Sequence, residues 1–192
     1  MKSLSILFLL FFVSVQTNAQ INTDHLNIGD DAPVITGVDQ FGKKINSTEI
    51  LKNNQILLVF YRGSWCPYCS KHLKELQANL DALRAKGYHV VVVSPEKAEK
   101  SKETSDKLKA GFSILHDSNN KIMDDYLVSF DVNAANLGNG YSGTLNRVEA
   151  YNVPGNNTLP VPATYIISKN GKVSFVHYDP DYKNRFDVKE LL

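Results

Sequence analysis

The order of apolar and polar positions along the chain predicts a sheet of buried strands with helices packed against it. Residues 56–61 form an almost unbroken apolar run, which is typical of a strand covered on both faces. Leucines at positions 73, 76, 80 and 83 then follow at helical spacing, so we expect a helix over residues 70–86 that ends at Gly87. Residues 88–93 predict a second buried strand, parallel to the first and reached by a right-handed crossover.

The second half of the chain continues this pattern with one interruption. Residues 96–110 predict a solvated helix with Glu–Lys pairs four residues apart, and residues 112–115 predict a short strand. Residues 122–130 predict another helix or part of one. Residues 131–158 hold seven Asn and four Gly, which favours an irregular surface excursion. Apolar runs at 163–168 and 172–177 flank Lys169-Asn170-Gly171, the turn signal of an antiparallel hairpin.

The N-terminal region predicts two separate features. Lys2, the apolar residues 4–15 and the small or polar residues 17–19 have the pattern of a secretory signal peptide cleaved after Ala19. An apolar run of about 12 residues is too short to span a bilayer of roughly 30 Å, although an uncleaved anchor is the alternative. Residues 27–47 carry turn residues between short apolar runs, which predicts an N-terminal hairpin or extension.

Composition then limits the class of protein. Residues 20–192 are enough for one domain with a real core, and the overall pattern indicates an α/β fold with a mixed sheet and helices on its faces. Without Lys2 this domain keeps 20 of the 21 basic residues, against 20 acidic ones. This balance gives no electrostatic reason to expect nucleic acid or an anionic membrane as a partner.

Both cysteines of the chain lie in the segment FYRGSWCPYCSKHL, residues 60–73, where the first strand ends and the first helix begins. The N-terminus of a helix offers unpaired N–H groups and the positive end of the helix dipole, which favour a thiolate over a thiol. Cys66 and Cys69 are one helical turn apart, so the second thiol can resolve what the first one forms. This arrangement predicts a redox-active dithiol.

Three other interpretations of the pair are weaker. A structural disulfide would constrain the unfolded chain little, because the loop that it closes is so short. A zinc site would need two further ligands, and His72 supplies only one candidate. Covalent haem attachment requires a histidine directly after the second cysteine, where this chain has Ser70. We therefore expect neither a metal ion nor another cofactor.

Two segments resemble a known superfamily. The motif Trp-Cys-Pro-Tyr-Cys at 65–69 resembles the redox motif of the thioredoxin fold, and residues 161–164, Val-Pro-Ala-Thr, resemble the segment that carries its cis-proline. The opening patterns at 29–33, 39–42 and 60–63 resemble the alkyl hydroperoxide reductase and peroxiredoxin branch. The similarity covers about residues 28–178. It implies a thioredoxin fold over 20–192 with an N-terminal extension and an irregular insertion before the cis-proline segment.

The two parts of this resemblance assign opposite roles to the cysteines. Peroxiredoxins usually have a Pro, a Thr or Ser four residues later, and the peroxidatic Cys three residues after that. On this chain, Arg62 takes the place of the Pro, Cys66 that of the Thr, and Cys69 falls on the peroxidatic position. Comparison with thioredoxin instead makes Cys66 the attacking thiol and Cys69 the resolving one. The chain thus resembles the peroxiredoxin-like group that carries a thioredoxin-type Cys-x-x-Cys.

Physical chemistry favours Cys66 as the first nucleophile, because it lies nearer the helix N-terminus and solvent, while Cys69 falls on the apolar stripe. Arg62 is expected either to stabilise a thiolate and polarise a peroxide or to be a surface cation. If Pro162 is cis, the resemblance implies that its peptide groups bind an extended substrate. The expected site residues are the catalytic Cys66, Cys69 and Arg62 and the substrate-binding Trp65, Pro67, Tyr68 and Pro162.

The resemblance and the motif together leave several functions open. The first hypothesis is an exported, periplasmic or extracellular thiol peroxidase: a cysteine attacks a peroxide, a Cys66–Cys69 disulfide forms, and an external dithiol such as a thioredoxin-like protein reduces it. The alternative is a thiol–disulfide oxidoreductase acting on protein disulfides. A binding module that only retains the scaffold is the third hypothesis. After signal cleavage we expect no stable membrane anchor.

Overall fold

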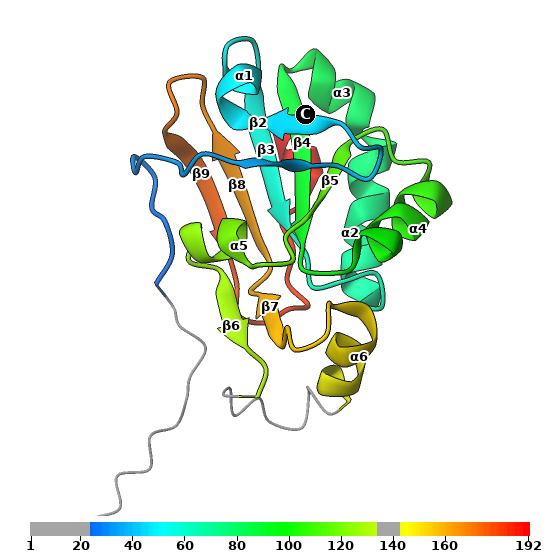
Figure 1. Ribbon diagram of the computed structural model, residues 1–192. Coiled ribbons are helices and arrows are strands. Elements are labelled where there is room, and N and C mark those ends of the chain that lie inside the picture. Colours follow the sequence, from blue (N-terminus) through cyan, green and yellow to red (C-terminus); the bar gives the residue numbers. More distant parts are fainter. Residues whose placement is uncertain (1–23, 134–142) are drawn as a thin grey trace, which may run out of the picture.

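The computed structural model describes residues 24–133 and 143–192, and a five-stranded mixed sheet lies at their centre (Figure 1). The parallel strands are β3 (Gln55–Phe60), β4 (Tyr88–Ser94) and β5 (Ser113–His116); the antiparallel ones are β8 (Ala163–Ile167) and β9 (Val173–Tyr178). The order across the sheet is β5-β4-β3-β8-β9. The expected α/β class, the parallel first pair and the C-terminal hairpin are therefore confirmed.

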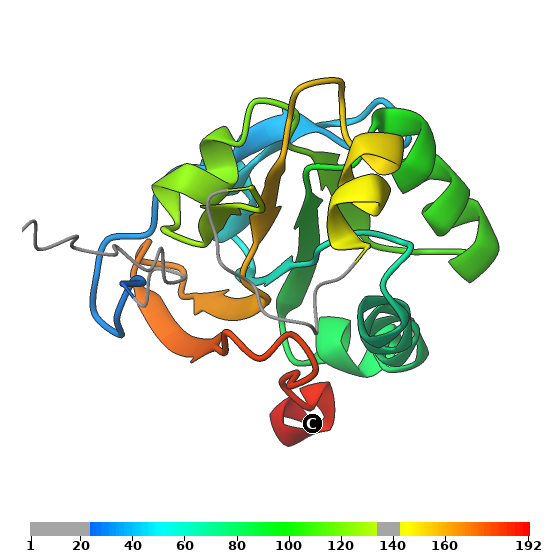
Figure 2. The ribbon, with the colours of Figure 1, turned by 90° about the horizontal axis from the view of Figure 1, so that it is seen from below.

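Two layers cover this sheet, one on each face (Figure 2). Helices α2 (Pro67–Ala78) and α3 (Leu80–Ala85) and the C-terminal 3-10 helix η2 (Val188–Leu191) lie on one face. The opposite face carries the hairpin of β1 (Thr36–Val38) and β2 (Lys44–Asn46) and helix α5 (Lys121–Asp125). Helix α4 (Ala98–Leu108) packs beside edge strand β5, and α1 (Ser47–Leu51) follows the hairpin.

The central strand β3 is apolar on both sides because each side faces a core. Leu57 and Val59 pack toward α2 and α3, whereas Leu58 and Phe60 pack toward the hairpin and α5. All four side chains are at most 1% exposed. An unbroken apolar run is what a strand in such a position requires. The position of β3 matters for function, because its carboxyl end leads directly into the two cysteines.

Two of the expected helices are shorter than their apolar spacing predicted. The helix expected over 70–86 begins at Pro67 and is interrupted at Asn79, whose side-chain Nδ2 donates to the carbonyl of Glu75 at 2.8 Å. The helix expected over 122–130 ends at Asp125, because Leu127 has a positive φ of 57°. A side chain that competes for backbone groups can end a helix, and so can a residue in the left-handed conformation. The spacing of apolar residues gives no sign of either effect.

The excursion expected over 131–158 contains more regular structure than its composition indicated. Its described part contains helix α6 (Thr144–Tyr151), and strand β7 (Thr158–Pro160) begins at its last residue. Strand β7 pairs with β6 (Ser129–Asp131) in a small antiparallel sheet. Its Asn side chains bond to the backbone: buried Asn152 donates to the carbonyls of Asn156 and Thr158. The expectation of an irregular segment is therefore wrong for α6, and residues 134–142 lie outside the described residues.

The expected cis-proline is absent. No cis peptide bond occurs among the described residues, so the bond before Pro162 is trans. Pro160 ends β7 and Ala163 begins β8, and the Val161 N–H donates to the Val128 carbonyl at 2.7 Å. The chain thus runs extended from one strand into the next, without the tight turn that usually holds a cis bond against the trans preference.

The expected signal peptide, residues 1–19, lies outside the described residues. Within the described part, none of the helices combines the length and the apolar character that a membrane span requires.

The two-sided burial of β3 generates a stability prediction. Leu58→Ala should lower the free energy of unfolding by about 2–5 kcal/mol, because it leaves a cavity in a core where the leucine is 0% exposed. Leu127→Ala removes the same atoms from a side chain that is 44% exposed and should cost less than about 1 kcal/mol. Denaturant unfolding of both variants checks this, and equal losses would contradict the assigned core.

Candidate active site

The two cysteines lie where the sequence predicts them, between the end of β3 and the start of α2. Cys66 is the N-cap residue of α2, in an extended conformation, Pro67 follows as the first helical residue, and Cys69 lies in the first turn. Proline fits at this position because its missing N–H would have no partner there. Ala163 pairs with Phe60, so Pro162 lies at the same end of the sheet as the dithiol.

Both cysteines are buried, each with a residue exposure of 1%. Neither thiol is open to solvent, but desolvation acts more strongly on Cys69 than on Cys66, in the expected order. They belong to the core cluster on the α2 face, and the rings of Trp65 and Tyr182 pack against that cluster. A protein-sized partner therefore cannot contact either sulfur atom without a rearrangement of the side chains around it.

The two thiols nevertheless differ strongly in acidity. A hydrogen bond from the Cys69 side chain lowers the pKa of Cys66 to about 6, against the opposing effect of burial. The Cys69 backbone N–H and the guanidinium groups of Arg62 and Arg185 lower it further. Burial raises the pKa of Cys69, and its hydrogen bond to Cys66 raises it again. At neutral pH Cys66 is thus the thiolate, and Cys69 keeps the proton that it donates.

Arg62 is a buried residue of this site, 2% exposed, so its interpretation as a surface cation is wrong. Its guanidinium carbon lies 4.9 Å from the ring centre of Trp65 and 4.3 Å from that of Tyr182. It also donates to the Thr144 hydroxyl of α6 at 3.4 Å. Aromatic faces stabilise a cation that has left water. The residue therefore brings a fixed positive charge close to the Cys66 sulfur.

The C-terminal segment after β9 supplies two further residues that the sequence did not indicate. Arg185 donates from Nη2 to the Cys69 sulfur at 3.3 Å. Tyr182 covers Arg62 and meets the ring of Tyr68 edge-on, with 5.7 Å between the centroids. Both are more than 110 residues from the cysteines in sequence. Residues 179–187 also lack the regular spacing of apolar residues that predicts a helix or a strand. Only the tertiary fold brings them to the dithiol.

Glu96 supports the loop between β3 and the cysteines. It was expected to pair with Lys100 on a solvated helix, but it is 0% exposed and precedes α4. Its carboxylate accepts from the Ser64 N–H and hydroxyl, both at 2.8 Å, and from the Tyr61 hydroxyl at 3.1 Å. Burial raises its pKa, and these three donors oppose that shift. The carboxylate thus fixes the turn that carries Cys66.

The remaining expected site residues surround the dithiol with different exposures. Trp65 stacks on Arg62, Tyr68 is 39% exposed, and Pro162 is buried at the end of the sheet. His72, one turn beyond Cys69, is also buried. Burial, followed by the charge of Arg185, lowers its pKa to about 4. It is therefore neutral at pH 7 and adds no charge beside the sulfur atoms.

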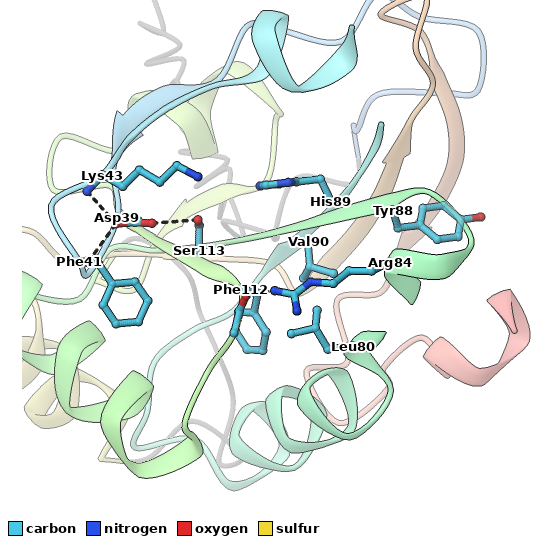
Figure 3. Close-up of a pocket in the computed structure, with 11 residues that line it drawn as sticks. Asp39, Phe41, Lys43, Leu80, Arg84, Tyr88, His89, Val90, Phe112 and Ser113 are labelled. Carbon is cyan, nitrogen blue, oxygen red and sulfur yellow. Dashed lines mark hydrogen bonds between the residues drawn. The ribbon is translucent and has the colours of Figure 1, made fainter. Parts of the chain in front are cut away.

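A separate cavity of about 220 Å³ lies at the opposite end of the sheet (Figure 3). It opens between the β1–β2 turn, the start of β4 and the start of β5. Asp39 in its wall accepts from the N–H groups of Phe41 and Lys43 and from the Ser113 hydroxyl. The first two bonds hold the β1–β2 turn, and the bond from Ser113 ties this turn to β5. The Asp39 carboxylate therefore has a structural role.

Comparison with solved structures shows which known fold this architecture shares. Peroxidoxin BcpB from Mycobacterium tuberculosis aligns with a TM-score of 0.65 at 16% identity, over 80% of this chain and 86% of that one. The thioredoxin domain of the thiol-disulfide oxidoreductase BVU-2223 from Bacteroides vulgatus aligns with a TM-score of 0.56 at 18% identity, over 82% and 93%. These likenesses show a thioredoxin fold.

The sequence comparisons identify the family within this fold. The pattern of the AhpC/TSA family matches residues 28–176, and the chain belongs to this family. Peroxiredoxin Bcp of Escherichia coli K12 is 26% identical over 163 residues, 85% of this chain and 92% of that protein. The chloroplastic peroxiredoxin Q of Oryza sativa subsp. japonica is 25% identical over 162 residues, 84% of this chain and 61% of that one. The chain is an oxidoreductase of the thiol-peroxidase type.

The unequal acidity of the two thiols can be titrated directly. The rate of Cys66 alkylation should rise as the pH passes through about 6 and level off above it, because the thiolate is the reacting species. Cys69→Ala removes the hydrogen-bond donor, so the same transition should move to higher pH. Ultraviolet absorbance of the thiolate gives a second measurement. A first transition that disappears in Cys69→Ala and persists in Cys66→Ala would reverse the assignment.

Gly63 allows the close packing of the loop before Cys66. Its φ is +153°, and a Cβ there would lie 2.4 Å from Trp65 Nε1 and 2.9 Å from Glu96 Oε1. Gly63→Ala should therefore displace Trp65 and lower both stability, by about 1–3 kcal/mol, and the rate of Cys66 oxidation.

Gly155→Ala is the matched control for this substitution. Gly155 also has a positive φ, +82°, but a Cβ there would have no neighbour within 4 Å. The control should cost about 1 kcal/mol through backbone strain and leave the oxidation rate unchanged. Thermal unfolding and single-turnover kinetics test both variants, and equal oxidation rates in the two would exclude a role of this packing.

Proposed function

We propose that this chain is an exported thiol peroxidase that reduces small hydroperoxides through a Cys66–Cys69 disulfide, with a thioredoxin-like dithiol as reductant. The observation that carries the proposal is a Cys66 thiol of low pKa, buried beside Arg62, with the proton-bearing Cys69 as its hydrogen-bond donor. Family membership and the peroxiredoxin relatives support the class of reaction. The apolar N-terminal pattern supports export.

The first step is attack of the Cys66 thiolate on the terminal oxygen of the hydroperoxide. The sulfur–oxygen bond forms as the O–O bond breaks, and the leaving alkoxide or hydroxide takes a proton to become an alcohol or water. Sulfur is oxidised to a sulfenic acid and the peroxide is reduced. Arg62 provides a positive charge for the oxygen that becomes negative, and its two aromatic neighbours hold that charge in place.

The second step is attack of Cys69 on the oxidised Cys66 sulfur. The disulfide bond forms, the sulfur–oxygen bond breaks, and the Cys69 proton leaves with the hydroxide as water. Because Cys69 follows Cys66 by one helical turn and already hydrogen-bonds to it, the attack requires little movement. The resolving thiol is thus in place before the peroxide arrives.

The third step restores the dithiol by exchange with an external one. A reductant thiolate attacks the Cys66 sulfur, Cys69 leaves as a thiolate, and the second reductant thiol then displaces Cys66. The reductant leaves as its own disulfide. Since both sulfur atoms are buried, side chains around them have to move before a protein can make this contact, and Trp65 and Tyr182 are partly buried rings packed against the same cluster.

A thiol–disulfide oxidoreductase acting on protein disulfides is the second candidate. The Cys-x-x-Cys motif and the structural likeness to the thioredoxin domain from Bacteroides vulgatus favour it. Burial of both sulfur atoms favours a small peroxide over a folded protein as the oxidant. Both candidates use Cys66 as the nucleophile, and they differ in the partner that delivers the oxidising equivalent.

Turnover with two alternative oxidants separates these candidates. Purified residues 20–192 are supplied with a thiol reductant and either hydrogen peroxide or a disulfide-bonded test protein. We expect faster turnover of peroxide, its loss in Cys66→Ser, and a single turnover in Cys69→Ser that stops at the sulfenic acid. Ser118→Ala, remote from the dithiol in sequence, serves as the handling control.

Three outcomes of this experiment would contradict the proposal. Faster turnover of the protein disulfide would favour the oxidoreductase, and turnover of neither substrate would exclude both enzymes. A Cys66→Ser variant that still consumes peroxide would show that Cys69 attacks first, as the peroxiredoxin comparison assigns.

A further inference from the structure

We infer that Arg185 is a positioning residue for Cys69: its guanidinium stabilises the negative charge on the Cys69 sulfur in the resolving step and in reduction of the disulfide. This inference rests on the disulfide cycle proposed above. It assigns a function to the C-terminal segment between β9 and η2, which the Cys-x-x-Cys motif does not include.

The geometry around Cys69 is specific. Arg185 Nη2 donates to the Cys69 sulfur at 3.3 Å, and Nη1 of the same guanidinium donates to the carbonyl of Asn184 at 3.1 Å. The next residue, Phe186, is 5% exposed and packs on Phe175 with 4.6 Å between the ring centroids. The backbone beside Arg185 is therefore anchored in the core, and the guanidinium is aimed at one sulfur atom.

Cys69 needs such a cation more than Cys66 does. It is buried, and its pKa is raised by burial and by the neighbouring Cys66 thiolate, while Arg185 and a backbone hydrogen bond from Arg62 oppose these effects. His72, one turn further along α2, is neutral and supplies no charge. The Arg62 guanidinium is held between two rings and bonded to Thr144. Arg185 is thus the cation whose hydrogen bond reaches the Cys69 sulfur in the described part of the chain.

Two steps of the cycle place negative charge on Cys69. In resolution its thiol loses a proton to the departing hydroxide as its sulfur bonds to Cys66. In reduction the disulfide breaks with the electron pair on Cys69, which leaves as a thiolate. Disulfide exchange is faster when the leaving thiol has the lower pKa. A charge-assisted hydrogen bond from Arg185 therefore accelerates both steps, whereas the first attack on the peroxide depends chiefly on Cys66.

The test compares three variants of the whole domain. Arg185→Gln removes the charge and keeps polar atoms, Arg185→Lys retains the charge, and Lys183→Gln removes an exposed cation two residues away as the matched control. Each is given hydrogen peroxide in a single turnover, and the rates of sulfenic acid formation and of its conversion to the disulfide are measured separately. Reduction of the preformed disulfide by dithiothreitol is measured as well.

We expect Arg185→Gln to slow conversion to the disulfide and its reduction at least about tenfold, with a smaller effect on sulfenic acid formation. Arg185→Lys should restore part of the loss, and Lys183→Gln should match the wild type. In a Cys66→Ser background, Arg185→Gln should also move the Cys69 thiolate transition to higher pH. A purely structural role would slow all steps alike and would not be rescued by lysine.

The remaining outcomes separate this inference from the proposed function. Wild-type rates of resolution and reduction in Arg185→Gln would overturn the role of Arg185 and leave the peroxidase intact. A wild-type protein that ignores peroxide, but whose disulfide reduction still depends on Arg185, would remove the peroxidase and support the positioning role. If Arg185→Gln does not fold, Arg185→Met, which keeps the apolar stem, must show the same slowing.

Discussion

The proposed chemistry depends on one contact between the two thiols at the start of α2, in which Cys69 donates a hydrogen bond to Cys66. Burial alone would raise the pKa of both thiols and leave the pair inert. The hydrogen bond instead makes them unequal: it lowers the pKa of Cys66 and raises that of Cys69. One sulfur is then ready to attack, and the other holds the proton that it must later release. In the proposed cycle, this one contact sets both the nucleophile and the resolving group.

The surrounding fold keeps that contact dry and fixed. The end of β3 delivers the chain to the site, Glu96 holds the turn, and Gly63 lets Trp65 and the carboxylate approach the same point. Arg62 and Arg185 then act from segments that lie far apart in the sequence. A dry site strengthens the effect of each charge, but it also restricts entry. The arrangement suits a small oxidant in the first step and requires movement of the covering rings for a protein reductant.

Much of the framework follows from local pattern, because strands buried on both faces and an Asn-Gly hairpin leave clear signals in sequence. The dithiol at the start of a helix was predictable for the same reason: β3, the motif and α2 are adjacent. Helix ends set by Asn79 and Leu127 were missed, since they depend on one side chain and one backbone angle. Arg185 could not be found, because a contact across 116 residues depends on the tertiary fold. The burial of Glu96 and of Cys66 could not be predicted either, because segments that are distant in sequence pack against both.

The most direct test of this account is to identify which sulfur receives the oxygen. The reduced protein is treated with substoichiometric peroxide, quenched within the first turnover with a reagent that labels sulfenic acids, and digested for mass spectrometry. The account predicts the label on Cys66 at early times, replaced by a Cys66–Cys69 disulfide as the reaction proceeds. A label on Cys69 before any disulfide forms would contradict it, because the thiol described as the proton donor would then be the nucleophile.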